Sequence, residues 1–265
     1  MSRTVVVGAS SGLGRCIGVG LGQRGDQVAL LARRRERIEA AAKEAGPGAI
    51  ALECDVTDEA SCQKAISDAA DALGGIDNLV YTPGVGPLVR MIDTDAETWR
   101  RVFDTNVIGA ALVTAAAVPH LAAAAGTAVY LSSPAGTFGP PWPGLGAYGV
   151  SKAALERLVE TWRAEHPNIG FTCLIAGECT GGEGDGQTGF NIGWDMELAR
   201  KAHPLWTSRG CMPGKLMPVE DLVEVVHMIL RTDAATSMPV VVVRGAPGIP
   251  AAFADSAPAS GSVTA

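Results

Sequence analysis

Short apolar runs rich in Val, Leu, Ile and Ala alternate along the chain with longer amphipathic segments. Seven runs are predicted as buried strands: Thr4 to Val7, Gln27 to Ala32, Ala49 to Cys54, Asn78 to Tyr81, Thr127 to Leu131, Gly170 to Ile175 and Pro239 to Val243. Helical segments separate nearly all of them, which favours strands that run parallel. The pattern therefore predicts an α/β fold with a doubly wound parallel sheet of about seven strands.

The segments between the strands carry helix signals. Asp58 is a possible N-cap for a helix from about Glu59 to Leu73, and a long Ala-rich helix is predicted from about Glu97 to Ala124. A single domain over residues 1–245 accounts for these elements, with a Gly-rich excursion at about 177–215. Residues 246–265 are rich in Ala, Pro, Ser and Gly, and we expect a flexible tail there.

Composition and charge narrow the class of protein. The net charge of −7 would repel a phosphate backbone, so nucleic acid is not expected as a partner. The longest apolar stretch, Val107 to Val118, is short for a membrane span, and the N-terminus has no signal-peptide pattern. The six cysteines and four histidines show no metal-ligand spacing. We expect a cytoplasmic protein with free thiols, no metal and no membrane partner.

A glycine-rich turn follows the first predicted strand and opens a helix, where backbone N–H groups and the helix N-terminus can bind a pyrophosphate. Gly8 would allow the tight turn, Gly12 the approach of phosphates, and Gly14 the packing of helix on strand. The turn comprises Gly8, Ala9, Ser10, Ser11, Gly12, Leu13 and Gly14. Its position favours nucleotide binding over a purely structural turn.

The spacing of these glycines and the Ser10-Ser11 pair resemble the classical short-chain dehydrogenase/reductase family. The resemblance implies a Rossmann-type single domain that binds a nicotinamide cofactor and acts as an oxidoreductase. An NAD site usually has an acid at the end of the second strand, but this chain has Arg33 and Arg34 there. A guanidinium matches a 2′-phosphate in charge and geometry, so we predict NADP(H), with Arg33 as principal contact and Arg34 as helper. A solvated helix start is the alternative.

The same resemblance assigns the segment after the third strand to the adenine. Asp55 would accept a hydrogen bond from the adenine amino group, and Val56 would lie beside it. Chemistry alone makes a turn or capping role for Asp55 equally acceptable.

Tyr148 and Lys152 lie four residues apart on a predicted helix, so they share a face. A neighbouring ammonium group favours the phenolate and is expected to lower the pKa of the tyrosine. By resemblance, Tyr148 is the general acid or base, Lys152 also holds the nicotinamide ribose, Ser133 binds the substrate oxygen, and Asn106 supports a water that relays protons. The short Tyr-Lys spacing points to carbonyl or secondary alcohol chemistry rather than enoyl reduction.

The chain departs from the family pattern at two cofactor segments. Tyr81-Thr82-Pro83-Gly84 replaces the usual Asn-Asn-Ala-Gly, although Gly84 is kept as a cofactor contact. Ala176-Gly177 replaces Pro-Gly after the sixth strand, and there Gly177 and Thr180 are the expected contacts to the phosphates or carboxamide.

The substrate is predicted only as a small carbonyl or alcohol compound, and four aromatic residues hint that it is apolar. Trp142 lies in a Pro-rich rim between Ser133 and Tyr148, and it is either a substrate contact or part of a rigid turn. Phe190, Trp194 and Trp206 could equally belong to the pocket, the core or a subunit interface.

Two other classes of protein remain open at this point. A sensor or scaffold that binds NADP(H) without turnover would share the fold, although it would not need all four catalytic residues. A sugar-nucleotide epimerase or dehydratase would need a larger C-terminal domain than the residues after Gly177 provide. The family resemblance also implies a homo-oligomer, a dimer or a homotetramer.

Overall fold

The computed structural model describes residues 1–180, 190–212, 214–232 and 236–246 of the chain. The first part of the chain forms β1 (Arg3–Val7), α1 (Gly12–Gln23), β2 (Gln27–Ala32), α2 (Arg35–Ala45), β3 (Ala49–Glu53), α3 (Glu59–Leu73) and β4 (Asn78–Tyr81). The middle part forms η1 (Met91–Asp93), α4 (Ala96–Phe103), η2 (Asp104–Ile108), α5 (Gly109–Ala124), β5 (Thr127–Ser132) and α6 (Gly146–Glu165). The last part forms β6 (Gly170–Ala176), β7 (Cys179–Thr180), α7 (Met196–Ser208), β8 (Met217–Pro218), α8 (Val219–Leu230) and β9 (Val240–Val243).

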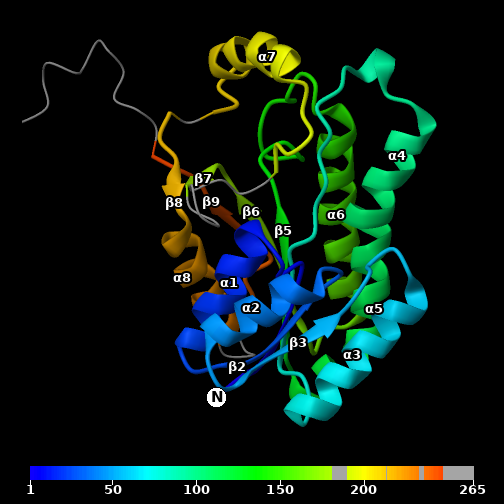
Figure 1. Ribbon diagram of the computed structural model, residues 1–265, viewed down its shortest axis with the longest axis vertical. Coiled ribbons are helices and arrows are strands. Elements are labelled where there is room, and N and C mark those ends of the chain that lie inside the picture. The colour runs from blue at the N-terminus through cyan, green and yellow to red at the C-terminus, as the bar shows by residue number, and fades with distance from the viewer. Residues whose placement is uncertain (181–189, 213, 233–235, 247–265) are drawn as a thin grey trace, which may run out of the picture.

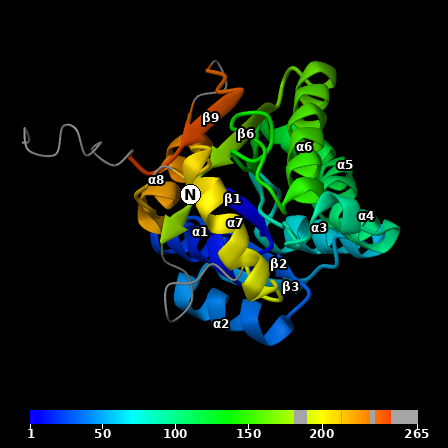
Figure 2. The same ribbon diagram turned by 90° about the horizontal axis from the view of Figure 1, so that it is seen from above.

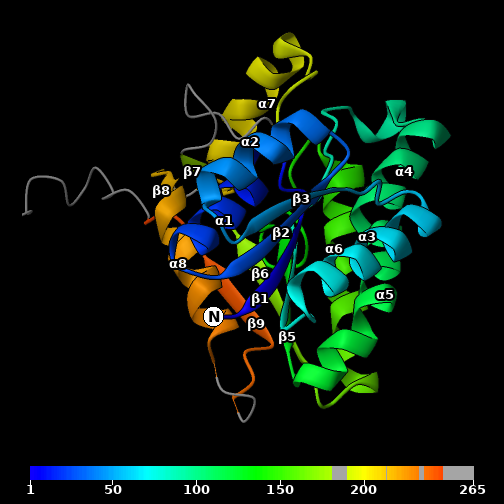
Figure 3. The same cartoon turned by 60° about the horizontal axis from the view of Figure 1, so that its bottom comes forward.

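The main sheet has seven parallel strands in the order β3-β2-β1-β4-β5-β6-β9. Helices α1, α2 and α8 cover one face, and α3, α5 and α6 cover the other, as the turned view in Figure 3 shows. Strand order reverses between β1 and β4, which is where sheets of this kind bind ligands at their carboxyl ends. The predicted doubly wound sheet of a single Rossmann-type domain is confirmed.

The predicted strands agree with the observed ones to within one residue at each end, because apolar runs set their positions. The prediction that all seven are buried is wrong for the edge strands β3 and β9, and β9 exposes Val240 and Val242 because no further strand of the described chain covers that edge. Asp58 caps α3 as predicted, since its carboxylate accepts a hydrogen bond from the backbone N–H of Ser61 at 3.1 Å. Each of the six cysteines carries a free thiol. Within the predicted excursion at 177–215, residues 181–189 lie outside the described residues, as does the predicted tail from residue 247 onward.

The predicted long helix forms, but one turn in it is π-helical and not α-helical. Between α4 and α5 the chain forms the π-helical turn η2, which places Asn106 fully inside the protein. The helix also continues through Pro119. By length and composition alone, the 29 residues from Ala96 to Ala124 could cross a membrane, which the short stretch considered in the sequence did not suggest. Core helices of soluble proteins pass the same test, and this helix packs on α3 and α6.

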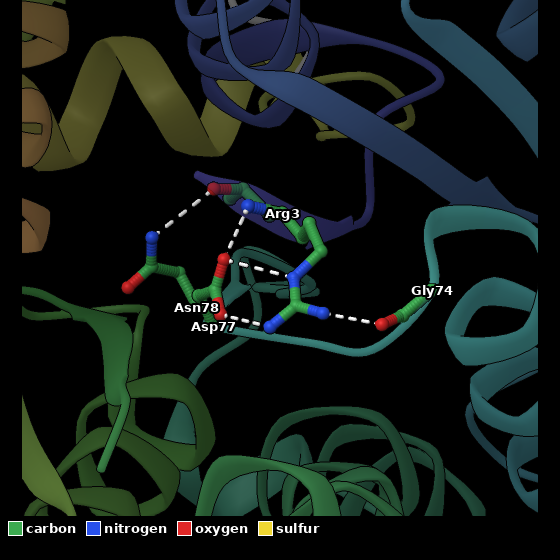
Figure 4. Close-up of polar contacts among 5 residues, drawn as sticks. Arg3, Gly74, Asp77 and Asn78 are labelled. Atoms are coloured by element: carbon green, nitrogen blue, oxygen red, sulfur yellow. Dashed lines mark hydrogen bonds and ion pairs between the residues drawn. The ribbon is translucent and has the colours of Figure 1, made fainter. Parts of the chain in front are cut away.

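An ion pair between Arg3 and Asp77 joins the amino ends of β1 and β4. The guanidinium Nε of Arg3 donates to Asp77 at 3.0 Å, and the backbone N–H of Arg3 donates to the same carboxylate at 2.8 Å. The side chain of Asn78 donates to Thr4 at 3.2 Å, and Arg3 also reaches the carbonyl of Gly74 (Figure 4). These bonds join β1 to β4 at the amino ends of the strands, and the glycine-rich turn lies at the opposite, carboxyl end of β1.

Helix α7 lies beyond the end of the sheet, at the top of Figure 1, and crosses above α1 in the view from above in Figure 2. It forms a third apolar cluster, separate from the two cores beside the sheet. The cluster contains Leu88, Leu145, Ala202, Trp206 and Cys211 and, at its edge, Trp142, Tyr148, Phe190 and Trp194. The fold therefore places an aromatic layer directly over the carboxyl ends of the central strands.

Candidate active site

The predicted phosphate-binding turn has the backbone that such a site needs. Gly8 and Gly12 adopt φ values of +87° and +56°, which residues with a side chain rarely adopt. A Cβ at Gly14 would lie 2.6 Å from the carbonyl oxygen of Gly8 and would also meet Thr82. The first turn of α1, wholly within the described chain, has no acidic residue to compete with an anion. The residues therefore fit a bound pyrophosphate.

Arg33 and Arg34, the two predicted contacts to a 2′-phosphate, have different surroundings. The guanidinium of Arg34 donates to Ser10 at 2.7 Å and to Ser11 at 2.6 Å, so it sits on the phosphate-binding turn. Arg33 lines a surface hollow together with Thr57 and Thr105. Both side chains are exposed, as a contact to a cofactor phosphate requires.

Asp55 has the turn role that the sequence left open. Its carboxylate accepts hydrogen bonds from the backbone N–H of Thr57 at 3.0 Å and from the Thr57 hydroxyl at 2.8 Å. Burial acts to raise the pKa of Asp55, but these bonds and the charge of Arg33 hold it below its ordinary value. Val56 is buried against Gly109, and the predicted contact of both residues with adenine remains a prediction.

The structure brings the three catalytic candidates Ser133, Tyr148 and Lys152 together at the carboxyl end of β5. Ser133 follows β5, and its hydroxyl lowers the pKa of the Tyr148 phenol on α6. The turn after Ser133 lies against this helix, since a Cβ at Gly149 would lie 2.7 Å from the carbonyl oxygen of Ala135. The ammonium Nζ of Lys152 lies 5.7 Å from the Tyr148 ring centroid and donates to the carbonyl of Leu131 at 2.7 Å. A phenol, a hydroxyl and a cation thus converge, which suits proton transfer to an oxygen.

The pKa of Tyr148 differs from the expectation. Burial raises it to about 12, against the lowering effect of the Ser133 hydrogen bond, and the Glu178 carboxylate raises it further. The expected lowering by Lys152 does not occur in this structure, where that cation is bonded to a backbone carbonyl. Burial lowers the pKa of Lys152 itself to about 8. At neutral pH, Tyr148 is therefore protonated and Lys152 is mostly charged.

Asn106 is enclosed between the turn after β4 and helix α6. Its side-chain oxygen accepts from the N–H of Val85 at 2.8 Å, and its amide group donates to Val85 and to the Ser151 hydroxyl. A Cβ at Gly84 would lie 3.4 Å from Nζ of Lys152, so Gly84 lies directly beside that ammonium. Asn106 thus fixes the position of the Gly84-Val85 backbone, and its role in a water relay remains a prediction.

The first departure from the family pattern has a structural explanation. The hydroxyl of Thr82 donates to the carbonyl of Val7 at 2.6 Å, and Tyr81 donates to the carbonyl of Thr105 at 2.6 Å. These side chains join β4 to β1 and to η2. The replaced positions therefore hold the backbone around the site by other hydrogen bonds.

The second departure lies after β6. The backbone N–H of Gly177 donates to Val243 at 2.8 Å, and Thr180 ends the short strand β7, where its hydroxyl donates weakly to Met217 at 3.4 Å. Glu178 is half-buried, and burial raises its pKa. Thr180 is exposed, and its predicted contact with the cofactor, like that of Gly177, remains a prediction.

The aromatic residues left open in the sequence form one continuous cluster that reaches the site. Phe190 packs on Tyr148 with ring centroids 4.9 Å apart, and Trp194 packs on Phe190 at 5.5 Å. Trp206 contacts both Trp194, at 5.9 Å, and Trp142, at 5.3 Å. The indole N–H groups of Trp194 and Trp206 donate to the backbone of Gly86 and Pro143. The rings therefore form an apolar wall that ends on the phenol of Tyr148.

One ionisable residue of this region, Glu156, was not among the predicted site residues. Glu156 lies one helical turn beyond Lys152 and two beyond Tyr148 on α6, and it is only 8% exposed. The spacing of four residues is a signal that could have found it. Among the residues that the structure describes, no group of His, Cys, Asp or Glu side chains is arranged to hold a metal ion.

Comparison with known proteins gives a consistent set of relatives. Residues 2–180 match the family described as short chain dehydrogenase. The 11-beta-hydroxysteroid dehydrogenase-like protein 3 of Arabidopsis thaliana is 34% identical over 65% of this chain and 57% of its own length. Dehydrogenase/reductase SDR family member 4 of Oryctolagus cuniculus is 31% identical over 65% of this chain and 68% of its own length. The match thus spans little more than half of the Arabidopsis protein.

Solved structures share the fold over nearly the whole chain. An alcohol dehydrogenase of the archaeon Thermococcus sibiricus, complexed with 5-hydroxy-NADP, superposes with a TM-score of 0.78 at 23% identity and covers 94% of this chain and 99% of its own. A short-chain type dehydrogenase/reductase of Mycobacterium marinum has a TM-score of 0.77 at 26% identity, covering 92% and 94%. A 3-ketoacyl-(acyl-carrier-protein) reductase of Brucella melitensis, complexed with NADH, has a TM-score of 0.77 at 21% identity, covering 91% and 96%.

Proposed function

This chain belongs to the short chain dehydrogenase family, and we propose that it is an oxidoreductase that moves a hydride between NADP(H) and a carbonyl or secondary alcohol carbon. The observation that carries the proposal is the position of the Lys152 ammonium beside the Tyr148 ring at the carboxyl end of β5, the strand that Ser133 follows. These groups lie next to the turn that fits a pyrophosphate, so proton transfer and cofactor binding are served by neighbouring parts of one sheet edge.

The cofactor would be held by the backbone of the glycine-rich turn and by the two arginines. Gly8, Gly12 and Gly14 leave room for phosphates near the N-terminus of α1. Arg33 is proposed as the principal contact to the 2′-phosphate and Arg34 as its helper, because no carboxylate follows β2 directly. Of the two structural neighbours with a nicotinamide nucleotide, one holds 5-hydroxy-NADP and the other NADH, so the preference for NADP(H) rests on these arginines.

The protein's own residues supply the proton. When bound, the reduced cofactor supplies the hydride. Tyr148, which the raised pKa keeps protonated at neutral pH, gives its proton to the carbonyl oxygen. Ser133 donates a hydrogen bond to the same oxygen and stabilises the charge that develops there. Lys152 supplies positive charge beside the phenol, and Asn106 holds the Gly84-Val85 backbone in place. In the oxidation direction, Tyr148 must first lose its proton.

The substrate is proposed as an apolar carbonyl or alcohol compound. The wall formed by Phe190, Trp194, Trp206 and Trp142 begins at the reacting phenol and consists of aromatic rings. The relatives named for 11-beta-hydroxysteroid dehydrogenation would act on a compound of this kind.

The assembly and location of the protein are part of the same proposal. We propose a cytoplasmic homo-oligomer, a dimer or tetramer, without nucleic acid or membrane partners. Helix α5 is apolar around much of its circumference, and Ile108 at its start is 47% exposed. Such a surface suits contact with a second copy of the chain.

The proposal is tested by a screen of carbonyl and alcohol compounds with each nicotinamide cofactor, followed by absorbance of the reduced form. Dissociation constants should favour NADPH over NADH, and Arg33→Asp should reverse or abolish that preference. Equal affinity of the parent protein for both cofactors would contradict the assignment of Arg33. Tight NADPH binding with no turnover of any compound would instead favour a sensor or scaffold.

A further inference from the structure

Glu156 is a buried carboxylate whose hydrogen bonds all lead to the segment that carries Ser133. Its Oε1 accepts a hydrogen bond from the Ser132 hydroxyl at 2.7 Å. Its Oε2 accepts from the hydroxyl of Thr137 and from the backbone N–H of Thr137 at 3.3 Å. The carboxylate therefore binds the residue just before Ser133 and a residue four positions after it.

The segment between these two anchors is tightly folded. The N–H of Ala135 donates to the Ser133 hydroxyl oxygen at 3.2 Å, and the N–H of Gly136 donates to the Ser133 carbonyl at 2.9 Å. A Cβ at Gly136 would collide with Oε1 of Glu156, so the backbone itself lies against the carboxylate. A small displacement of Glu156 would thus move the turn on which the Ser133 hydroxyl stands.

A buried carboxylate is a costly way to stabilise a helix contact. Its desolvation must be offset by several good hydrogen bonds, and an apolar side chain of similar volume often stabilises a protein as well. Here the donors come from both sides of one site residue, while the two preceding turns of the same helix carry Lys152 and Tyr148. The arrangement suits the placement of Ser133 better than it suits stability alone.

We propose that Glu156 is a positioning residue: it holds the turn at residues 132–137 against α6 and thereby keeps the Ser133 hydroxyl beside the phenol of Tyr148. The inference rests on the oxidoreductase function proposed above. Glu156 does not touch the substrate in this account, and it acts only through Ser132 and Thr137. Because the Ser133–Tyr148 contact exists without substrate, the proposal can be examined separately from turnover.

The principal experiment compares the parent protein with Glu156→Gln. Glutamine keeps the size but is uncharged and has one acceptor oxygen, so either Ser132 or Thr137 must face an NH2 group, which donates and does not accept. We expect kcat to fall roughly tenfold to a hundredfold, the range for a small displacement of a site residue. The dissociation constant for NADPH and the Tm should stay close to those of the parent. A parallel loss of kcat, NADPH affinity and Tm would show a general structural role and overturn the proposal.

A second measurement needs no substrate. The chain has three tyrosines, so protein labelled with 13C at the tyrosine Cζ atoms should give three NMR signals. The signal absent in Tyr148→Phe identifies Tyr148. In Glu156→Gln that signal should shift or broaden, while Tyr81, bonded to Thr105, and Tyr130, bonded to Thr114, act as internal references. An unchanged Tyr148 signal would overturn the proposal even if no substrate were known.

Two further variants complete the test: one changes the same hydrogen-bonded contact from its other end, and one is a control on α6. Thr137→Val removes one hydroxyl donor and keeps the side-chain volume, so it should shift the Tyr148 signal in the same direction even if Glu156→Gln folds poorly. Glu160→Gln changes an exposed carboxylate one turn further along α6, paired with Arg157, and should leave all readouts unchanged. If Tyr148→Phe retained full activity, the proposed function would fail, whereas a Tyr148 signal that ignores both Glu156 and Thr137 would refute the positioning role alone.

Discussion

The cofactor side and the aromatic side of the site are built by different means. On the cofactor side, the backbone shapes the surface: Gly8 and Gly12 adopt positive φ, and Gly14 lies against the Gly8 carbonyl. On the aromatic side, Phe190 and Trp194 form the surface through ring packing. Backbone-built sites need particular glycines at particular spacings, but a ring wall can use any large apolar side chain that fills the space.

Tyr148 lies between the cofactor side and the aromatic side, and each side shifts the pKa of its phenol. Ser133, which follows a strand of the sheet, lowers the pKa of Tyr148 through a hydrogen bond. Burial raises it more strongly, and the Phe190 ring is one of the groups that cover the phenol. The pKa of about 12 is therefore a balance between the sheet side and the aromatic side.

The largest effect should come from Tyr148→Phe, which removes the group shared by both sides. The ring packing is kept, so folding and NADPH binding should persist while kcat falls by roughly two to four orders of magnitude, as for loss of a general acid. Steady-state kinetics on a substrate from the screen measures this. Lys152→Met should reduce NADPH affinity as well. Full activity of Tyr148→Phe would disprove the mechanism.

On the cofactor side, Gly14→Ala should be the next most damaging change. The added Cβ would press on the Gly8 carbonyl and on Thr82, so the turn and helix α1 must move apart. We expect a loss of about 1–3 kcal/mol in the free energy of unfolding and much weaker NADPH binding. Gly25→Ala is a control for strain alone, since φ there is +93° and a Cβ would meet nothing within 4 Å. Its destabilisation should leave NADPH affinity intact.

On the aromatic side, Phe190→Ala should change acid–base behaviour without affecting NADPH binding. Water reaching the phenol reduces the desolvation that raises its pKa, so the pKa of Tyr148 should fall from about 12 toward 10. Alcohol oxidation, which needs the deprotonated phenol, should then begin at lower pH than in the parent. Carbonyl reduction, which needs the protonated phenol, should decline at lower pH. Unchanged pH profiles for both directions would separate Phe190 from the tuning of Tyr148.

The smallest effect is expected far from both sides, at the ion pair of Arg3 and Asp77. The hydrogen bond from Arg3 holds the pKa of Asp77 below its ordinary value of 3.8. Its stabilising contribution is therefore present above about pH 4 and is lost as pH falls through the folded-state pKa. Asp77→Asn should cost up to about 1 kcal/mol at neutral pH and progressively less in acid, measured by urea unfolding. An equal cost at all pH values would indicate a loss of packing rather than of charge.

The sequence predicted the cofactor side more completely than the aromatic side. Strand positions, the Asp58 cap and the glycine-rich turn depend on local periodicity and on backbone needs, which leave clear marks in a sequence. The contact of Phe190 with Tyr148 joins residues 42 positions apart, and no local pattern encodes it. The raised pKa of Tyr148 depends mainly on burial, which is not visible in a Tyr-x-x-x-Lys spacing.

The surroundings of Glu156 and Asn106 also could not be predicted from the sequence. The spacing of Glu156 from Lys152 was readable, but a carboxylate on a helix is usually solvated, and only the fold shows that donors from residues 132–137 surround it. Asn106 was predicted as a site residue, yet the π turn that buries it has no sequence mark, because its residues are ordinary helix residues.

The π turn accommodates one extra residue in the long helix without changing the direction or the faces of that helix. A π turn holds one residue more than the α-helical turn it replaces, so deleting one residue of η2 would restore a plain α-helical turn. Because the larger rotation per residue of the α-helix nearly compensates for the lost residue, α5 would keep its face toward α3. Asn106, by contrast, would lose its alignment with Val85 and Ser151. A single-codon deletion in this turn should therefore impair the site more than the packing of the fold.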